Sequence, residues 1–149
     1  MPFSISEEAK EYYFKLNKKS KTGRFQTQFD FYYLCLLVGF KKEFIGKNIG
    51  SKFVDEFPKE FRIQRDQIIG LLISTEINRR GIDISNKQEV EKIILNLVRS
   101  DSPTRLSETG ENLINQYSKG GFNKIAEKIP LSSIFNLDSF LVQFYNLIN

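Results

Sequence analysis

The chain has 149 residues, of which 40% are apolar and 27% are charged, as is usual for a globular domain with its own core. It has no histidine and a single cysteine, Cys35, which excludes an internal disulfide framework, His-ligated metals, thiolate cages and the Ser-His and Cys-His catalytic arrangements. The net charge is +4, and residues 1–62, with 12 Lys/Arg and 8 Asp/Glu, carry the whole excess.

The first predicted helix begins after Ser6, because Glu7 and Glu8 place acids in its first turn. Apolar residues then recur at helical spacing as far as Leu16, and Gly23 is expected to close the segment. The helix therefore carries its lysines toward its C-terminal end.

A second helix is predicted from about Thr27 to Val38, with Gly39 as its C-cap. It is apolar on nearly every face, which is typical of a central helix surrounded by others. A buried strand is the alternative interpretation of so short an apolar run. Residues 40–62 are expected to form an irregular packed loop, because glycines and Pro58 interrupt a segment rich in bulky apolar residues.

Periodic apolar residues predict further helices over residues 64–80 and from a capping box at Ser85 onward. A shorter helix begins near Leu106 and is expected to stop at Gly120 and Gly121, a short turn follows, and a last amphipathic helix covers residues 137–148. Together these segments predict an all-α fold, a compact bundle of six to eight helices in a single domain over residues 1–149.

Catalytic motifs are absent from the sequence. There is no Walker phosphate loop and no dinucleotide-binding fingerprint, and the isolated acids lie where helix caps and turns are expected. We therefore expect a protein that is not an enzyme, with no cofactor, no metal and no small-molecule substrate. No segment resembles a signal peptide and the longest apolar stretch, residues 29–40, is too short to span a bilayer, so a cytoplasmic protein away from membranes is expected.

The basic residues predict a surface that binds the phosphate backbone of DNA without reading its sequence. No acid occurs between Lys15 and Arg24, and the lysines of the irregular loop after the second helix are expected to extend the patch, namely Lys41, Lys42, Lys47 and Lys52. The alternative is a solvated helix end, since cations near a C-terminus complement the helix dipole. The candidate nucleic-acid-binding residues are Lys15, Lys18, Lys19, Lys21, Arg24, Lys41 and Lys42.

The last helix is rich in aromatic residues and must be buried against something. Either the chain's own core or a partner covers it. The partner hypothesis makes Phe140, Phe144 and Tyr145 the binding residues, and the partner is then another protein subunit or a second copy of the chain. The function without nucleic acid is then that of an adaptor or inhibitor, for example a phage-encoded one.

In the first quarter of the chain, the opening from Ser4 to Lys10, the pair Thr22-Gly23 and the apolar segment Tyr33–Leu36 follow one another in this order. This arrangement resembles the start of the small helical E subunits of bacterial DNA-sulfur-modification (phosphorothioation) systems. The chain departs from the family in its greater length and in the inserted residues 24–30. The resemblance implies a non-catalytic, DNA-associated subunit of a prokaryotic modification or phage-defence system, with the Lys15–Arg24 run facing DNA.

Overall fold

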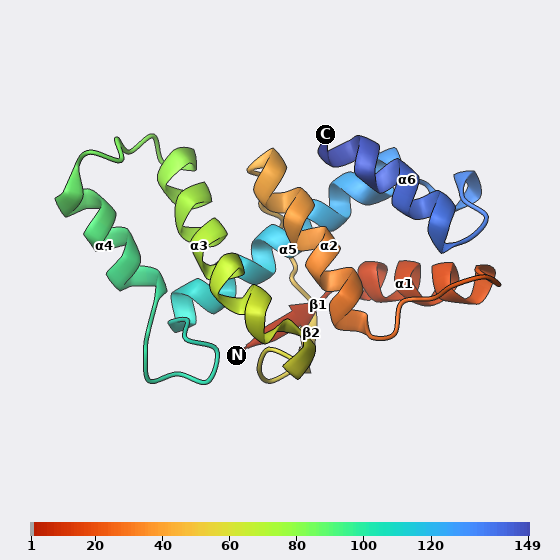
Figure 1. Ribbon diagram of the computed structural model, residues 1–149, viewed down its shortest axis with the longest axis horizontal. Coiled ribbons are helices and arrows are strands. Elements are labelled where there is room, and N and C mark those ends of the chain that lie inside the picture. The colour runs from red at the N-terminus through yellow and green to blue at the C-terminus, as the bar shows by residue number, and fades with distance from the viewer. Residues whose placement is uncertain (1) are drawn as a thin grey trace. The chain divides into compact units, whose positions relative to one another are not determined.

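The computed structural model describes residues 2–149 and is mostly helical over that range (Figure 1). Six α-helices and two short 3-10 helices occur within these residues, which confirms the helical prediction. A small two-stranded sheet, β1 (Phe3–Ile5) paired with β2 (Ser51–Val54), was not expected. None of the helices in this part of the chain has both the length and the apolar character needed to cross a membrane.

The chain divides into two compact units. Unit 1 comprises the residues up to Ser4 and residues 52–114, and unit 2 comprises residues 5–51 and 115–149. The longest helix, α5 (Glu108–Lys128), contributes its first residues to unit 1 and the remainder to unit 2. The prediction of a single domain over residues 1–149 stays a prediction.

Unit 1 contains η1 (Lys59–Phe61), α3 (Arg62–Arg79) and α4 (Lys87–Leu97). Helices α3 and α4 pack together, and their apolar stripes supply fully buried residues such as Ile68, Leu72 and Leu97. These two helices lie where the periodicity predicted them. The cap of α4 differs, because the side chain of Asn86, and not that of Ser85, accepts from the backbone N–H of Glu89.

Unit 2 contains α1 (Glu7–Lys19), α2 (Gln28–Lys42), η2 (Leu131–Ser133) and α6 (Leu137–Ile148). Ser6 caps α1, as predicted, by accepting from the N–H of Ala9. An aromatic cluster fills the core: the Tyr12 ring lies 5.5 Å from Phe31 and 6.1 Å from Phe140, centroid to centroid. The Tyr12 hydroxyl donates to the carbonyl of Ile129 at 2.6 Å, so its polar end is satisfied as well.

Two predicted helix ends are wrong, and both errors concern glycine. Helix α2 continues through Gly39 to Lys42, and α5 continues through Gly120 and Gly121. A Cβ on Gly39 would lie 2.0 Å from the Tyr117 carbonyl oxygen, and one on Gly121 would lie 1.6 Å from that of Cys35. These glycines therefore let the backbones of α2 and α5 touch where the helices cross (Figure 1).

Residues 40–62 are more regular than the loop that was predicted. They contain the last turn of α2, the strand β2 and the 3-10 helix η1. The extension of α2 ends at Glu43, which adopts the left-handed conformation with φ 50° and closes the helix. Glycines interrupt this segment and its apolar runs are short, so it shows no helical or strand periodicity from which these short elements could be predicted.

Candidate functional site

The basic end of α1 comprises five of the residues selected from the sequence: Lys15, Lys18, Lys19, Lys21 and Arg24. All five are exposed. They lie on the last two turns of α1 and on the loop that leads to α2, so the structure brings them together as the sequence predicted. The basic side chains at this helix end also complement the negative end of the helix dipole.

Neighbouring groups already engage three of these side chains. Lys15 forms an ion pair with Glu11 at 2.9 Å, between residues one helical turn apart. The Lys19 ammonium donates to the carbonyl of Leu131 at 2.7 Å, and the Arg24 Nε donates to that of Ser20 at 3.3 Å. Within the part of the chain that the structure describes, Lys18 and Lys21 make no such contact. They are the two cations most available to an anion.

The loop after α1 is held by side-chain hydrogen bonds. The Asn17 side chain exchanges two of them with the backbone of Phe25, at 3.0 and 2.9 Å. Ser20 donates to the carbonyl of Gly23 and accepts from the N–H of Leu137 at 2.9 Å. Lys21 and Arg24 are therefore carried on an ordered segment, which reduces the entropy lost when they bind a ligand.

An exposed aromatic residue lies beside the basic side chains. Phe14 is 52% exposed, whereas its neighbours Tyr12 and Tyr13 are buried in the core. Lys18 lies four residues after Phe14 on the same face of α1. Proteins that bind single-stranded nucleic acids combine exposed aromatic rings with cationic side chains, because bases stack on the rings while phosphates contact the cations.

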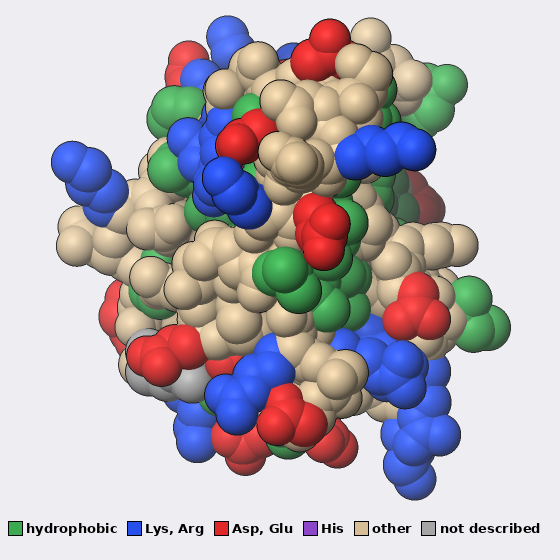
Figure 2. Space-filling view, turned by 90° about the vertical axis from the view of Figure 1, so that its left-hand side faces the viewer, with side chains coloured by type: hydrophobic (Ala, Val, Ile, Leu, Met, Phe, Trp, Pro, Cys, Tyr) green, Lys and Arg blue, Asp and Glu red, His purple; other side chains and the backbone are tan. Residues whose placement is uncertain are grey.

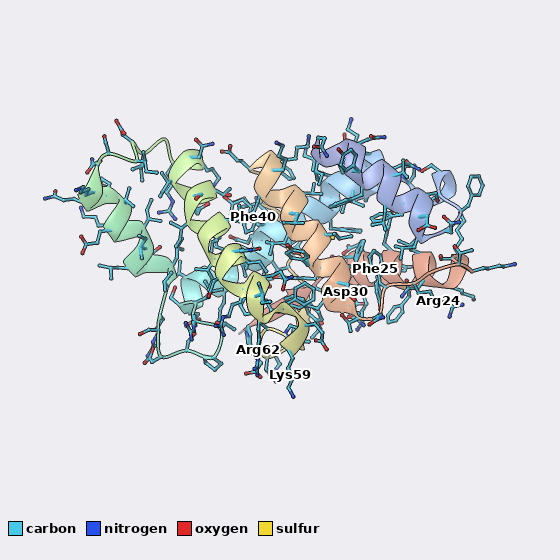
Figure 3. The ribbon with its side chains drawn as sticks, viewed as in Figure 1. Arg24, Phe25, Asp30, Phe40, Lys59 and Arg62 are labelled. Atoms are coloured by element: carbon cyan, nitrogen blue, oxygen red, sulfur yellow. The ribbon has the colours of Figure 1, made fainter. Side chains whose placement is uncertain are left out.

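Lys41 and Lys42 do not extend this surface. They lie in the last turn of α2, whereas Arg24 precedes its first turn. A helix of 15 residues is about 22 Å long, so the two groups are at opposite ends of it. Figure 3 shows Arg24 near the start of α2 and Phe40 near its end. The sequence prediction of one continuous patch is wrong on this point.

The aromatic residues selected on α6 are mostly internal. Phe140 and Phe144 are 0% and 6% exposed and belong to the core of unit 2, so they present no surface to a partner. Tyr145, in contrast, is 64% exposed, next to Val142 at 63% and Leu141 at 37%. Of the three partner-binding residues predicted from the sequence, only Tyr145 faces solvent, and the other exposed apolar side chains of α6 were not predicted.

A pocket in unit 1 brings together cations that are not among the site residues predicted from the sequence. It has a volume of about 490 Å³ and is lined by residues 54–59, the start of α3 and Pro103. Lys59, Arg62 and Arg65 contribute to its wall. The sequence did contain a signal, since these three residues recur at intervals of three after Pro58 and so share one face of a helix that starts there.

Charge elsewhere on unit 1 is mixed. Figure 2 shows the face that carries α4, where basic and acidic side chains lie among hydrophobic ones and neither sign dominates. Within residues 2–149, no three Asp, Glu or Cys side chains come together as a metal ion would require. Cys35 is buried in α2, and its burial raises the pKa of the thiol.

Comparison of the chain with protein-family models, with curated proteins and with solved structures finds no match.

Proposed function

We propose that the chain binds nucleic-acid phosphates through the basic end of α1, as a non-catalytic subunit of a prokaryotic DNA-associated complex for modification or phage defence. The observation that carries the proposal is the exposed Phe14 ring one helical turn before Lys18. A solvated helix end explains the lysines alone, because they complement the helix dipole. Base stacking gives a role to the exposed phenyl ring beside them, which the helix dipole does not require.

The arrangement favours single-stranded over duplex nucleic acid. Phe14 offers a stacking surface for one unpaired base, a contact worth about 1–3 kcal/mol. Lys18 and Lys21 neutralise adjacent phosphates, with Arg24 close by on the fixed loop. Two or three such contacts predict that affinity falls by about tenfold between 50 and 200 mM salt. No feature of the surface reads base edges, so binding is independent of sequence.

The test is a fluorescence-anisotropy titration of labelled single-stranded and duplex DNA at the two salt concentrations. We expect Lys18→Glu/Lys21→Glu to abolish binding to both and Phe14→Ala to weaken binding to the single strand by at least fivefold. Lys87→Glu/Lys92→Glu is the control, because it makes the same charge change at exposed positions of α4. Absence of binding at 50 mM salt, or an equal loss in the control, contradicts the proposal.

The second candidate is a protein-binding adaptor that uses α6. Leu141, Val142 and Tyr145 are exposed on one face of this helix, because residues three and four positions apart are neighbours on a helix surface. Self-association through this face is measured by light scattering after gel filtration at increasing protein concentration. Val142→Glu/Tyr145→Glu should return an associated species to the monomer, and a monomer at all concentrations argues against self-association by α6.

A further inference from the structure

The pocket of unit 1 lies where β2 leads into η1 and α3 (Figure 3). Lys59 and Arg62 lie side by side at the start of the helical segment in that view, and both line the pocket. Arg65 follows one turn later. Three cationic residues from successive turns therefore line one pocket with a volume of about 490 Å³.

The lining of the pocket holds two acids, Asp55 and Glu56, against these three cations. Asp55 also lines the wall, but Lys52 already pairs with it at 2.8 Å. Asp66 lies 3.5 Å from the Nε of Arg65, in an ion pair of adjacent residues that forms no hydrogen bond. Glu56 is the remaining acid of the lining, and its side chain is exposed. An excess of positive charge remains at the wall.

Arg65 is the least exposed of the three cations, at 23% of its side chain, and its Nε is shielded from solvent without a hydrogen-bond acceptor. Burial restricts the guanidinium, so little rotational freedom is lost when it binds an anion. A guanidinium presents donors in a planar fork that matches the oxygens of phosphate. Because the Nε of Arg65 is shielded, a phosphate in the pocket would meet the outer part of the guanidinium.

The cations lie where the dipole of α3 does not favour them, and Glu60 of the adjoining η1 is an acid next to them in the chain. Helix α3 has no acid in its first turn, and Arg62 stands at its start, where the positive end of the dipole repels cations. Each other α-helix with described caps carries an acid in its first turn. An anion bound in the pocket would remove the repulsion among the cations and the helix end.

From these contacts we infer that the pocket binds the phosphate group of a small phosphomonoester, with Lys59, Arg62 and Arg65 as the residues that hold it. The pocket is larger than phosphate alone and falls in the usual range for small organic ligands. Val54, Pro58 and Pro103 supply apolar surface for a compact body attached to the phosphate. The site is separate from the basic end of α1 and does not depend on the function proposed for it.

The experiment is a titration of the ¹⁵N-labelled chain with inorganic phosphate, with phenyl phosphate and with sodium chloride at matched ionic strength. We expect saturable shifts of amide signals confined to residues 54–65 and to the region of Pro103, with phenyl phosphate binding more tightly than inorganic phosphate. Equal affinities identify free phosphate as the ligand and overturn the assignment to an ester. Shifts that follow chloride alone, or that spread over the basic end of α1, overturn the site.

Variants separate the site from diffuse attraction of anions. Arg65→Gln and Lys59→Gln/Arg62→Gln should each weaken phenyl phosphate binding at least tenfold, whereas Lys87→Gln, a distant exposed cation in unit 1, should leave it unchanged. Lys59 and Arg62 are exposed, so their variant tests the site even if Arg65→Gln lowers stability. Unchanged affinity in the double variant overturns the inference. Both variants should retain the DNA binding proposed for α1, so that failure of one proposal is distinguished from failure of the other.

Discussion

At the scale of single residues, Gly39 and Gly121 determine how closely two helices approach. The crossing of α2 and α5 brings backbone against backbone, and the missing Cβ atoms leave the space for it. Closely packed interiors relax little, so an added methyl group here must move a helix. The conformational freedom of glycine is irrelevant at these positions, since both lie inside regular helices.

We predict that Gly121→Ala lowers the free energy of unfolding by at least about 3 kcal/mol, because its Cβ would lie 1.6 Å from the Cys35 carbonyl oxygen. Gly70→Ala is the matched control in the middle of α3, where nothing lies within 4 Å of the added atom. There alanine should stabilise by about 0.5–1 kcal/mol through helix propensity. Urea denaturation measures both, and equal effects would contradict the close crossing.

Glu76 is a second residue whose environment makes a measurable prediction. Its carboxylate is fully buried and accepts hydrogen bonds from Arg79 at 2.7 and 2.9 Å and from Arg80 at 2.9 Å. The side chains of Arg79 and Arg80 are 35% and 38% exposed, so water can solvate both guanidinium groups if the carboxylate is lost. Loss of the Glu76 carboxylate should therefore lower the free energy of unfolding by less than the roughly 3–5 kcal/mol expected when one partner of a fully buried ion pair is removed.

We therefore expect Glu76→Gln to destabilise the protein by about 2 kcal/mol in urea denaturation. Glu89→Gln is the control, because its ion pair with Lys92 at 3.3 Å is exposed and should contribute less than about 0.5 kcal/mol. If the two variants lose the same stability, the buried carboxylate does not organise the arginines as the contacts imply.

At the scale of the elements, the sequence predicts helices well where one apolar stripe and one cap agree. Helices α1, α3 and α6 lie within two or three residues of their predicted ranges for this reason. The helix ends are predicted wrongly where a residue type can have either of two structural roles. Glycine ends many helices, but at Gly39 and Gly121 it serves packing between helices, and only the partner helix reveals which meaning applies.

The cap of α6 gives the prediction at this scale. Asn136 accepts from the N–H of Ser139 at 2.9 Å, while Ser139 accepts from the N–H of Asn136 at 3.1 Å. Asn136→Ala removes the first of these bonds and should cost about 1 kcal/mol of stability. Asn146→Ala, at an exposed position in the last turn of the same helix, should be neutral or slightly stabilising in the same thermal or urea measurement. A neutral Asn136→Ala would show that packing alone fixes the start of α6.

At the scale of the whole molecule, the sequence predicts a site only where its residues are neighbours in the chain. The run from Lys15 to Arg24 stays together because one helix and one fixed loop carry it. The prediction that Lys41 and Lys42 extend this surface is wrong, because the length of α2 separates these two lysines from Arg24. The pocket of unit 1 was missed because Pro103 reaches its wall from some forty residues after Arg65, and tertiary packing alone brings such segments together.

The absence of histidine makes a prediction for the molecule as a whole. No side chain has an ordinary pKa between about 6 and 8, so the free energy of unfolding should be nearly constant in that range. On the acid side, a backbone hydrogen bond, followed by Lys119, lowers the pKa of Glu8, and a backbone hydrogen bond from Ser85 lowers that of Asp83. Their contributions are present above the unfolded pKa values of about 4 and are lost as the pH falls through the folded ones.

On the alkaline side, burial raises the pKa of the Cys35 thiol and of the Tyr12 and Tyr32 hydroxyls. The folded chain keeps these protons after the unfolded chain has lost them, so stability is complete below the unfolded pKa values and declines above them. The decline should begin near pH 8.5 with Cys35 and steepen above about 10 with the tyrosines, by up to about 1.4 kcal/mol per pH unit for each group. Urea midpoints of the wild type and of Cys35→Ala between pH 6 and 11 measure this: the variant should lose the decline between pH 8.5 and 10 and keep the steeper one. A decline already present between pH 6 and 8, or one unchanged in Cys35→Ala, would show that a group other than this buried thiol controls the alkaline limit.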